Sequence, residues 1–181
     1  MDLLAANLPW YIARSAAIAA YILMFFIIVI GTGMTTGFIY RVSDPLKIWV
    51  VHQYLAISLT VFIIVHAIAL MFDKYVNFKL ADILIPFSSS YKTLYLSSGI
   101  IGFYVLIILI ITSVYWRLKY AKVWLGMHYL SYFLFAISFI HGVFIGTDSS
   151  NWVMQTVYWT TGLIYLWLMI YRFHWYKKNH I

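Results

Sequence analysis

Long apolar runs, separated by short clusters of charged residues, dominate the pattern of the chain. Lys, Arg, Asp and Glu are absent from residues 15–40, 48–72, 93–116, 123–147 and 149–171. Each run exceeds the roughly 20 residues with which an α-helix crosses a bilayer. The pattern therefore predicts an all-α integral membrane protein, a bundle of about five transmembrane helices.

The runs leave no room for a second folding unit, so we expect a single domain over residues 1–181. The helices are predicted near residues 12–36, 48–72, 93–116, 123–146 and 151–173. The connection 73–92 is longer than the others, and its middle, LADILIPF, is apolar but too short to span. We therefore expect residues 73–92 to form an interfacial or lid-like loop at one end of the bundle.

Composition narrows the class of protein further. Hydrophobic residues make up 65% of the chain and charged residues only 9%, whereas a soluble domain has roughly 25% charged residues. The leader MDLLAANLPW has no basic segment, so the first run is expected to remain as a helix instead of being cleaved as a signal peptide. The absence of cysteine excludes disulfides, thiolate metal sites and iron–sulfur clusters.

Basic residues are distributed unequally between the two sides that five spans create. Four lie on the side of the N-terminus: Arg14, Lys74, Lys79 and Lys92. The other eight share the opposite side: Arg41, Lys47, Arg117, Lys119, Lys122, Arg172, Lys177 and Lys178. The positive-inside rule places the eight-residue side in the cytoplasm. The expected topology is an N-terminus outside and a cytoplasmic C-terminus in the plasma (inner) membrane, and no basic and aromatic stripe indicates nucleic acid binding.

Four histidines lie within the second and fourth predicted spans, which run in the same direction. His52 and His128 both follow shortly after a lysine on the cytoplasmic side. His66 and His141 each lie seven residues before an aspartate on the outer side. The four imidazoles are thus predicted to form an inner pair and an outer pair, roughly 20 Å apart at 1.5 Å per residue.

Two neutral imidazoles at one depth can bind a haem iron from both faces. Such a haem cycles between ferric and ferrous iron and passes electrons. The His52–His66 spacing falls about 40° short of four helical turns, but the His128–His141 spacing misses by about 140°. The fourth span therefore needs tilt, a local change of winding, or differently rotated haems.

Other readings of the polar residues remain open. A lone membrane histidine could instead bond a neighbour, and the four together could serve a cofactor-free permease for metal ions or protons. Arg14 could bind a propionate of the outer haem or lie at the lipid interface as an ordinary anchor. Asp148 and Ser149 precede the fifth span, and we expect them to cap it or, failing that, to contact an electron acceptor.

The spacings H-x13-H from His52 and H-x12-H from His128 resemble the ferric reductase-like transmembrane domain superfamily. This superfamily includes the membrane part of NADPH oxidases, ferric reductases and the haem subunit of a bacterial methionine sulfoxide reductase system. The segments WYIARSAAIAAYIL, LADILIPFSSSYK and HYLSY…HGVFIGTDS are also similar, and small stand-alone bacterial members resemble the chain most.

The resemblance implies two b-type haems. His52 and His128 would hold the inner haem and His66 and His141 the outer one, with electrons flowing from the cytoplasm outward. The resemblance thus implies an oxidoreductase component, a cytochrome b of the electron-transport type.

The larger members carry a cytoplasmic flavin and nicotinamide domain, but here ten residues follow Tyr171 and no Gly-rich phosphate-binding turn exists. We expect no flavin or NAD(P)H site in this chain. A separate flavoprotein or membrane quinol would then donate electrons, and ferric iron, oxygen or a periplasmic redox protein would accept them. Within the same class, the chain could instead hold one haem and serve as the quinone-linked subunit of a methionine sulfoxide reductase system.

Overall fold

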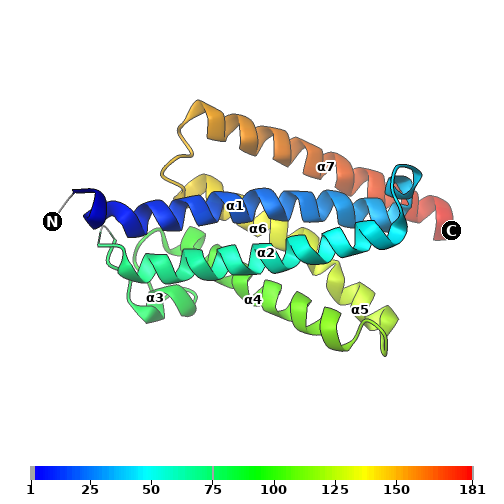
Figure 1. Cartoon of the computed structure of the whole chain (residues 1–181), viewed down its shortest axis with the longest axis horizontal. Helices are drawn as coiled ribbons and strands as arrows, with labels where there is room; N and C mark the ends of the chain where they lie inside the picture. Colours follow the sequence, from blue (N-terminus) through cyan, green and yellow to red (C-terminus); the bar gives the residue numbers. More distant parts are fainter. Residues whose placement is uncertain (1–2, 75, 181) are drawn as a thin grey trace.

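The computed structural model describes residues 3–74 and 76–180. Within them the fold is all-helical, with five spans long and apolar enough to cross a membrane, which confirms the predicted class of a multi-pass membrane protein. Figure 1 shows the long helices running along one axis, with the two chain ends at opposite ends of the bundle. The elements are α1 (Leu3–Thr36), η1 (Phe38–Arg41), α2 (Pro45–Phe72), α3 (Leu80–Leu84), α4 (Thr93–Tyr115), α5 (Ala121–His128), α6 (Leu130–Ile145) and α7 (Trp152–His180).

The first connection shows why α2 begins earlier than the predicted residue 48. Asp44 caps the helix, because its carboxylate accepts hydrogen bonds from the backbone N–H groups of Leu46 and Lys47. Pro45 occupies the first helical position, where a missing N–H costs nothing. Gly37 links α1 to η1 with a φ of 79°, a conformation that favours glycine. Lys47 therefore belongs to α2, although the apolar run that predicted this helix begins only at residue 48.

The fourth predicted span, 123–146, is a single apolar span over Ala121–Ile145, and its helix is interrupted at Tyr129 between α5 and α6. The backbone N–H of Tyr132 donates to the carbonyl of Tyr129 at 3.1 Å, a spacing of three residues. Such 3₁₀ winding turns about 120° per residue, compared with about 100° in an α-helix. Overwinding at this point reduces the rotational mismatch between His128 and His141 that an ideal helix would have.

The first and last helices are longer than predicted. Helix α1 begins at Leu3 instead of residue 12, and α7 continues to His180 instead of ending near residue 173. The basic residues of α7 lie within the helix, because a helix does not need to stop where its lipid-facing part ends. The predicted bounds followed the apolar runs and therefore missed these extensions.

The connection 73–92 is not a featureless loop. It contains the short helix α3, and it packs back onto α4: Tyr104 donates its hydroxyl to the carbonyl of Leu84, and the Phe87 N–H donates to Ser97 Oγ, both at 2.8 Å. Asn77, Phe87 and Lys92 adopt positive φ angles, which make the turns in this segment. The segment thus folds against the end of the bundle that carries the start of α1 (Figure 1).

The bundle is built from two tightly packed helix pairs. Helix α2 runs along α1, and α6 runs along α4, whereas α2 and α6 make little direct contact with each other. Helix α7 lies against α1 and α6 and diverges from the bundle at one end (Figure 1). Association in lipid depends on packing and on hydrogen bonds between helices. Two of these bonds join α1 to its neighbours, from Tyr21 to Thr161 and from Thr32 to Tyr132.

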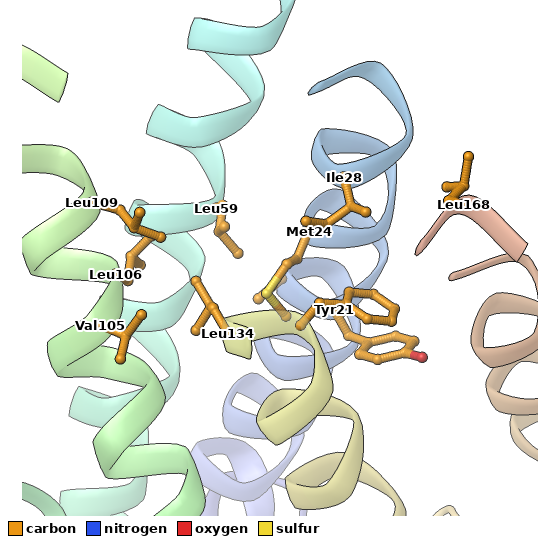
Figure 2. Close-up of a cluster of buried hydrophobic side chains, with 11 residues drawn as sticks. Tyr21, Met24, Ile28, Leu59, Val105, Leu106, Leu109, Leu134 and Leu168 are labelled. Atoms are coloured by element: carbon orange, nitrogen blue, oxygen red, sulfur yellow. The ribbon is translucent and has the colours of Figure 1, made fainter. Parts of the chain in front are cut away.

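Where the two pairs meet, apolar side chains fill the middle of the bundle. Figure 2 shows Leu59 of α2, Leu106 and Leu109 of α4, and Leu134 of α6 gathered there, with Met24 of α1 beside them. Phe135 is completely buried and has its ring 4.8 Å from that of Tyr165 and 5.7 Å from that of Tyr21. This apolar cluster joins α1, α2, α4, α6 and α7.

Replacement of Phe135 by alanine is expected to destabilise the bundle by about 3 kcal/mol. The estimate is at the low end for such a change, because lipid is as apolar as the core and only packing is lost. The measurement is unfolding of the purified protein in mixed micelles. Phe133→Ala is the matched control, since that ring is 49% exposed on the same helix. Equal losses for the two variants would contradict the proposed core.

Candidate functional site

The four histidines lie at two levels, one on each side of the apolar cluster. His52 and His66 belong to α2, while His128 ends α5 and His141 belongs to α6. Leu59 is midway between the two histidines of α2 and is almost fully buried. The two levels on α2 are separated by roughly 20 Å along the helix axis. Imidazoles of α2 thus face the second helix pair both above and below a closed core.

His66 and His141 line one pocket at the end of the bundle where α1 begins. His66 Nδ1 lies 2.8 Å from the carbonyl oxygen of Ala13, and His141 Nδ1 lies 2.8 Å from that of Tyr95. A carbonyl oxygen can only accept, so each Nδ1 carries the proton. The lone pair of each neutral imidazole is then on Nε2. This tautomer is the one in which a histidine binds a metal through Nε2 and is oriented by a second hydrogen bond.

Each of these hydrogen bonds lies within one tightly packed helix pair. His66 of α2 is bonded to α1, and His141 of α6 is bonded to α4. The two rings are therefore fixed separately, each by the helix next to its own. A group bound by both would join the two helix pairs.

Two glycines allow a histidine ring to lie directly against the backbone of the neighbouring helix. A Cβ atom at Gly99 of α4 would lie 2.5 Å from both Cε1 and Nδ1 of His141. A Cβ atom at Gly31 of α1 would lie 3.3 Å from Cε1 of His52. Each helix pair thus has a glycine against one of its histidines, in keeping with the small residues at membrane helix interfaces.

His52 and His128 come together at the other level. Their ring centroids are 6.3 Å apart with an interplanar angle of 57°. Two imidazoles that bind one metal ion between them, with bonds of about 2 Å, have ring centres roughly 6 Å apart. The observed separation is therefore compatible with a shared iron.

The His52–His128 pair is less firmly anchored than the His66–His141 pair. His128 Nδ1 is 3.5 Å from Ser113 Oγ, at the limit of a hydrogen bond, and that hydroxyl already accepts from Trp124 Nε1 at 3.1 Å. His52 Nδ1 is buried and has no hydrogen-bond partner among the described residues. Each level thus has two histidine rings, but only the rings of His66 and His141 are both held by short hydrogen bonds.

Arg14 lies in the lining of the His66–His141 pocket and forms an ion pair with Asp148. This pair joins α1 to the connection between α6 and α7. The expectation that Asp148 or Ser149 caps the fifth span is wrong, because Asn151 Oδ1 accepts the Val153 N–H at the start of α7. Ser149 instead donates its hydroxyl to the carbonyl of Gly146. Arg14 Nε is buried and has no hydrogen-bond partner in the described part of the chain.

The connection 73–92 supplies part of the same pocket. Val76, Phe78 and Tyr91 line it together with His66 and His141, and Lys92 Nζ donates to the carbonyl of Phe144 at 2.7 Å. The segment therefore covers the His66–His141 level and ties the start of α4 to the end of α6. The lid-like role expected for residues 73–92 stays a prediction.

Sequence reasoning missed several residues that shape the two levels. Gly31 and Gly99 were indistinguishable from other helical glycines, because only the neighbouring ring makes them necessary. Ser113 gave no signal either. Arg172 was counted only for its charge, yet its Nη2 donates to the Tyr129 hydroxyl at 2.7 Å. Its place in an otherwise apolar helix was the one available indication.

The donor set fits a haem better than a caged metal ion. Among residues 3–74 and 76–180, no three His, Asp or Glu side chains form a group that could hold one metal ion, whereas the four histidines form two pairs. An apolar pocket with opposed imidazoles is the environment of a haem with two axial histidines. His66 and His141 meet this requirement most fully, because each has an anchored Nδ1.

Comparison with known proteins gives one finding on the family. The model of the ferric reductase like transmembrane component matches residues 16–139. This segment is more than half of the chain; it includes His52, His66 and His128 and ends two residues before His141. The comparisons with curated proteins and with solved structures found no match.

Gly99→Ala is expected to displace the His141 ring and break its hydrogen bond to Tyr95, because the new methyl group would collide with the ring. The loss of ring orientation should lower retention of haem at this level by about 10–100-fold. Absorbance of the haem-loaded protein during dialysis against apomyoglobin measures the retention. Gly126→Ala is the control, since a Cβ there has no neighbour within 4 Å. Unchanged retention in Gly99→Ala would refute the close approach.

Proposed function

The chain belongs to the family of ferric reductase-like transmembrane components, a family whose role is electron transfer across a membrane, and we propose that it is a di-haem b-type cytochrome. It would hold one haem between His52 and His128 and one between His66 and His141. Electrons would cross the plasma membrane from a cytoplasmic donor to an acceptor outside.

The observation that carries the proposal is the anchoring of His66 and His141. Both Nδ1 atoms donate to backbone carbonyls at 2.8 Å, so both rings have their Nε2 lone pairs free. A histidine with a purely structural role does not need a second histidine of the same tautomer in its pocket. Two rings with the same tautomer in one pocket are what two axial ligands of a single iron require.

The protein's own residues hold and orient the cofactor. The carbonyls of Ala13 and Tyr95 fix the depth and rotation of the His66 and His141 rings. Hydrogen bonding at Nδ1 also makes Nε2 more basic and therefore a stronger ligand for a metal ion. Haem, when bound, would supply reversible one-electron chemistry, and the two histidines that hold it would leave no position on the iron for a substrate. Leu59, Leu134 and Phe135 are buried between the two levels, and such an apolar cluster offers no polar partners for water.

Arg14 is proposed to bind a propionate of the haem held by His66 and His141. Guanidinium groups have five N–H donors and bind carboxylates in a bidentate fork. One donor is used by Asp148, while Nε is buried and unpartnered among the described residues. Arg14 can therefore hold Asp148 and a second carboxylate together.

The distribution of basic residues supports the proposed direction. Eight of the twelve lie at the end of the bundle that carries His52 and His128, and this excess is typical of the cytoplasmic side. The donor there would be a flavoprotein or a membrane quinol. The acceptor at the other end would be ferric iron, oxygen or a periplasmic redox protein.

A second candidate function follows from the unequal support of the two pairs. His66 and His141 could hold the only haem, with a quinone at the level of His52 and His128. The buried, unpartnered Nδ1 of His52 favours this reading, since a quinone oxygen could accept its proton. The chain would then be the quinone-linked haem subunit of a methionine sulfoxide reductase system.

Reduced-minus-oxidised spectra test the assignment. Wild-type protein is expected to have two b-type components and a haem-to-chain ratio of two by the pyridine haemochrome method. His66→Ala and His128→Ala should each lose a different component, because each removes one axial ligand. His174→Ala is the control, since that ring bonds the carbonyl of Ile170 on its own helix.

Three results would contradict the di-haem proposal in different ways. A ratio of one, with loss only in His66→Ala, would establish the single-haem function. The absence of a Soret band after expression with added haem would point to the permease. Spectra indifferent to both substitutions would refute the histidine ligands.

The absence of cysteine in the chain makes the orientation testable by single-cysteine labelling. In right-side-out vesicles from an expressing bacterium, Ser90→Cys is expected to react with a membrane-impermeant maleimide. Val42→Cys, at a position 83% exposed on the other end of the bundle, should react only after the vesicles are opened. The reverse pattern would overturn the proposed topology.

A further inference from the structure

Arg172 is a cation within the last span, at the level of His52 and His128. Its Nη2 donates to the Tyr129 hydroxyl at 2.7 Å, and its guanidinium stacks over the rings of Trp175 and Tyr129, with Cζ 4.8 Å and 5.7 Å from the ring centroids. Two aromatic faces and one hydroxyl thus hold the planar group in a fixed position.

This arrangement leaves the charge of Arg172 without an anion. Nη1 is buried and has no hydrogen-bond partner among the described residues. The one ion pair found in that part of the chain joins Arg14 to Asp148 at the other end of the bundle. A buried donor without a partner costs about 1–3 kcal/mol, and more when it is charged. A guanidinium held in this way is prepared for an oxyanion.

The contact with Tyr129 places Arg172 at the level of His52 and His128. Tyr129 directly follows His128 at the break between α5 and α6, and its ring stacks with that of Tyr132 at 6.4 Å. The hydroxyl of Tyr132 is bonded to Thr32, the neighbour of the glycine that lies against His52. Arg172 is therefore connected through two tyrosines to the residue that follows His128 and to the turn of α1 that lies against His52.

The other level has a counterpart to Arg172. Arg14 lines the pocket of His66 and His141, stacks on Trp10 at 5.7 Å and also has a buried, unpartnered N–H in the described residues. Each histidine pair is thus accompanied by one arginine that stacks on an aromatic ring and has a spare donor. The two arginines lie on α1 and α7, outside the helices that carry the histidines.

We propose that Arg172, positioned by Tyr129 and Trp175, binds a carboxylate of the group held between His52 and His128, namely a haem propionate. The inference rests on the proposed function. It goes beyond the family match, because Arg172 lies outside residues 16–139. An oxyanion at this site could also come from a lipid phosphate headgroup, so the experiment must separate the two sources.

The test is a redox titration of the haem-loaded full chain in nanodiscs. Arg172→Gln should lower the midpoint potential of the component that is lost in His128→Ala. Reduction adds negative charge, and the substitution removes a nearby cation. A tenfold fall in the equilibrium constant for reduction, which is 59 mV for one electron, is expected, with the other component unchanged. Arg117→Gln is the matched control, since it removes the same charge from a guanidinium that stacks on Trp49 at the same end.

A second arm identifies the source of the anion. Without the guanidinium a propionate takes up a proton more readily, so the midpoint potential of Arg172→Gln should become dependent on pH. In protein reconstituted with the dimethyl ester of haem, whose carboxylates are blocked, this pH dependence should be absent. A pH dependence that persists with the ester, or a potential that follows the fraction of anionic lipid in the nanodisc, would overturn the propionate assignment in favour of a headgroup phosphate.

Two further results keep the inference separate from the proposed function. If the wild-type chain binds two haems but neither potential moves in Arg172→Gln, the inference fails alone; if no haem binds, both fail. Should Arg172→Gln not fold, Tyr129→Phe replaces it, because it removes only the hydroxyl that accepts from Nη2. That variant should lower the same midpoint potential, with about a threefold fall in the equilibrium constant for reduction. An unchanged potential would refute the role of Arg172.

Discussion

The hydrogen bonds that orient the imidazoles within each helix pair are the interaction on which the rest of the structure depends. In a bilayer the hydrophobic effect does not drive apolar helices together, so close packing and hydrogen bonds must set the depth and rotation of each helix. The bonds from His66 to Ala13 and from His141 to Tyr95 do this for α1 with α2 and for α4 with α6. The candidate site is then formed between two units that are each already aligned.

The break at Tyr129 serves two purposes. It overwinds the fourth span, which brings His128 closer to the rotational phase of His141. It also places a tyrosine beside His128 whose hydroxyl accepts from Arg172, so that α7 is connected to the same level.

The two levels differ in ways that suit opposite ends of an electron path. The His66–His141 level has anchored rings, an ion pair and a covering segment from residues 73–92. The His52–His128 level has weaker anchoring and most of the basic residues. Between them, Leu59, Leu134 and Phe135 close the bundle, so that electrons alone, without water or ions, would have a route.

The sequence by itself determined the class of fold, the five spans and the pairing of the four histidines in depth, because bilayer thickness and helical rise relate residue number directly to depth. It indicated that the His128–His141 spacing needed a distortion, but not where. Only the tertiary structure decided the break at Tyr129, the need for glycine at position 99, the pairing of Arg14 with Asp148 and the unpaired donor of Arg172. These features depend on which side chains face each other across helices, and rotation and tilt of packed helices do not follow from hydropathy along one chain.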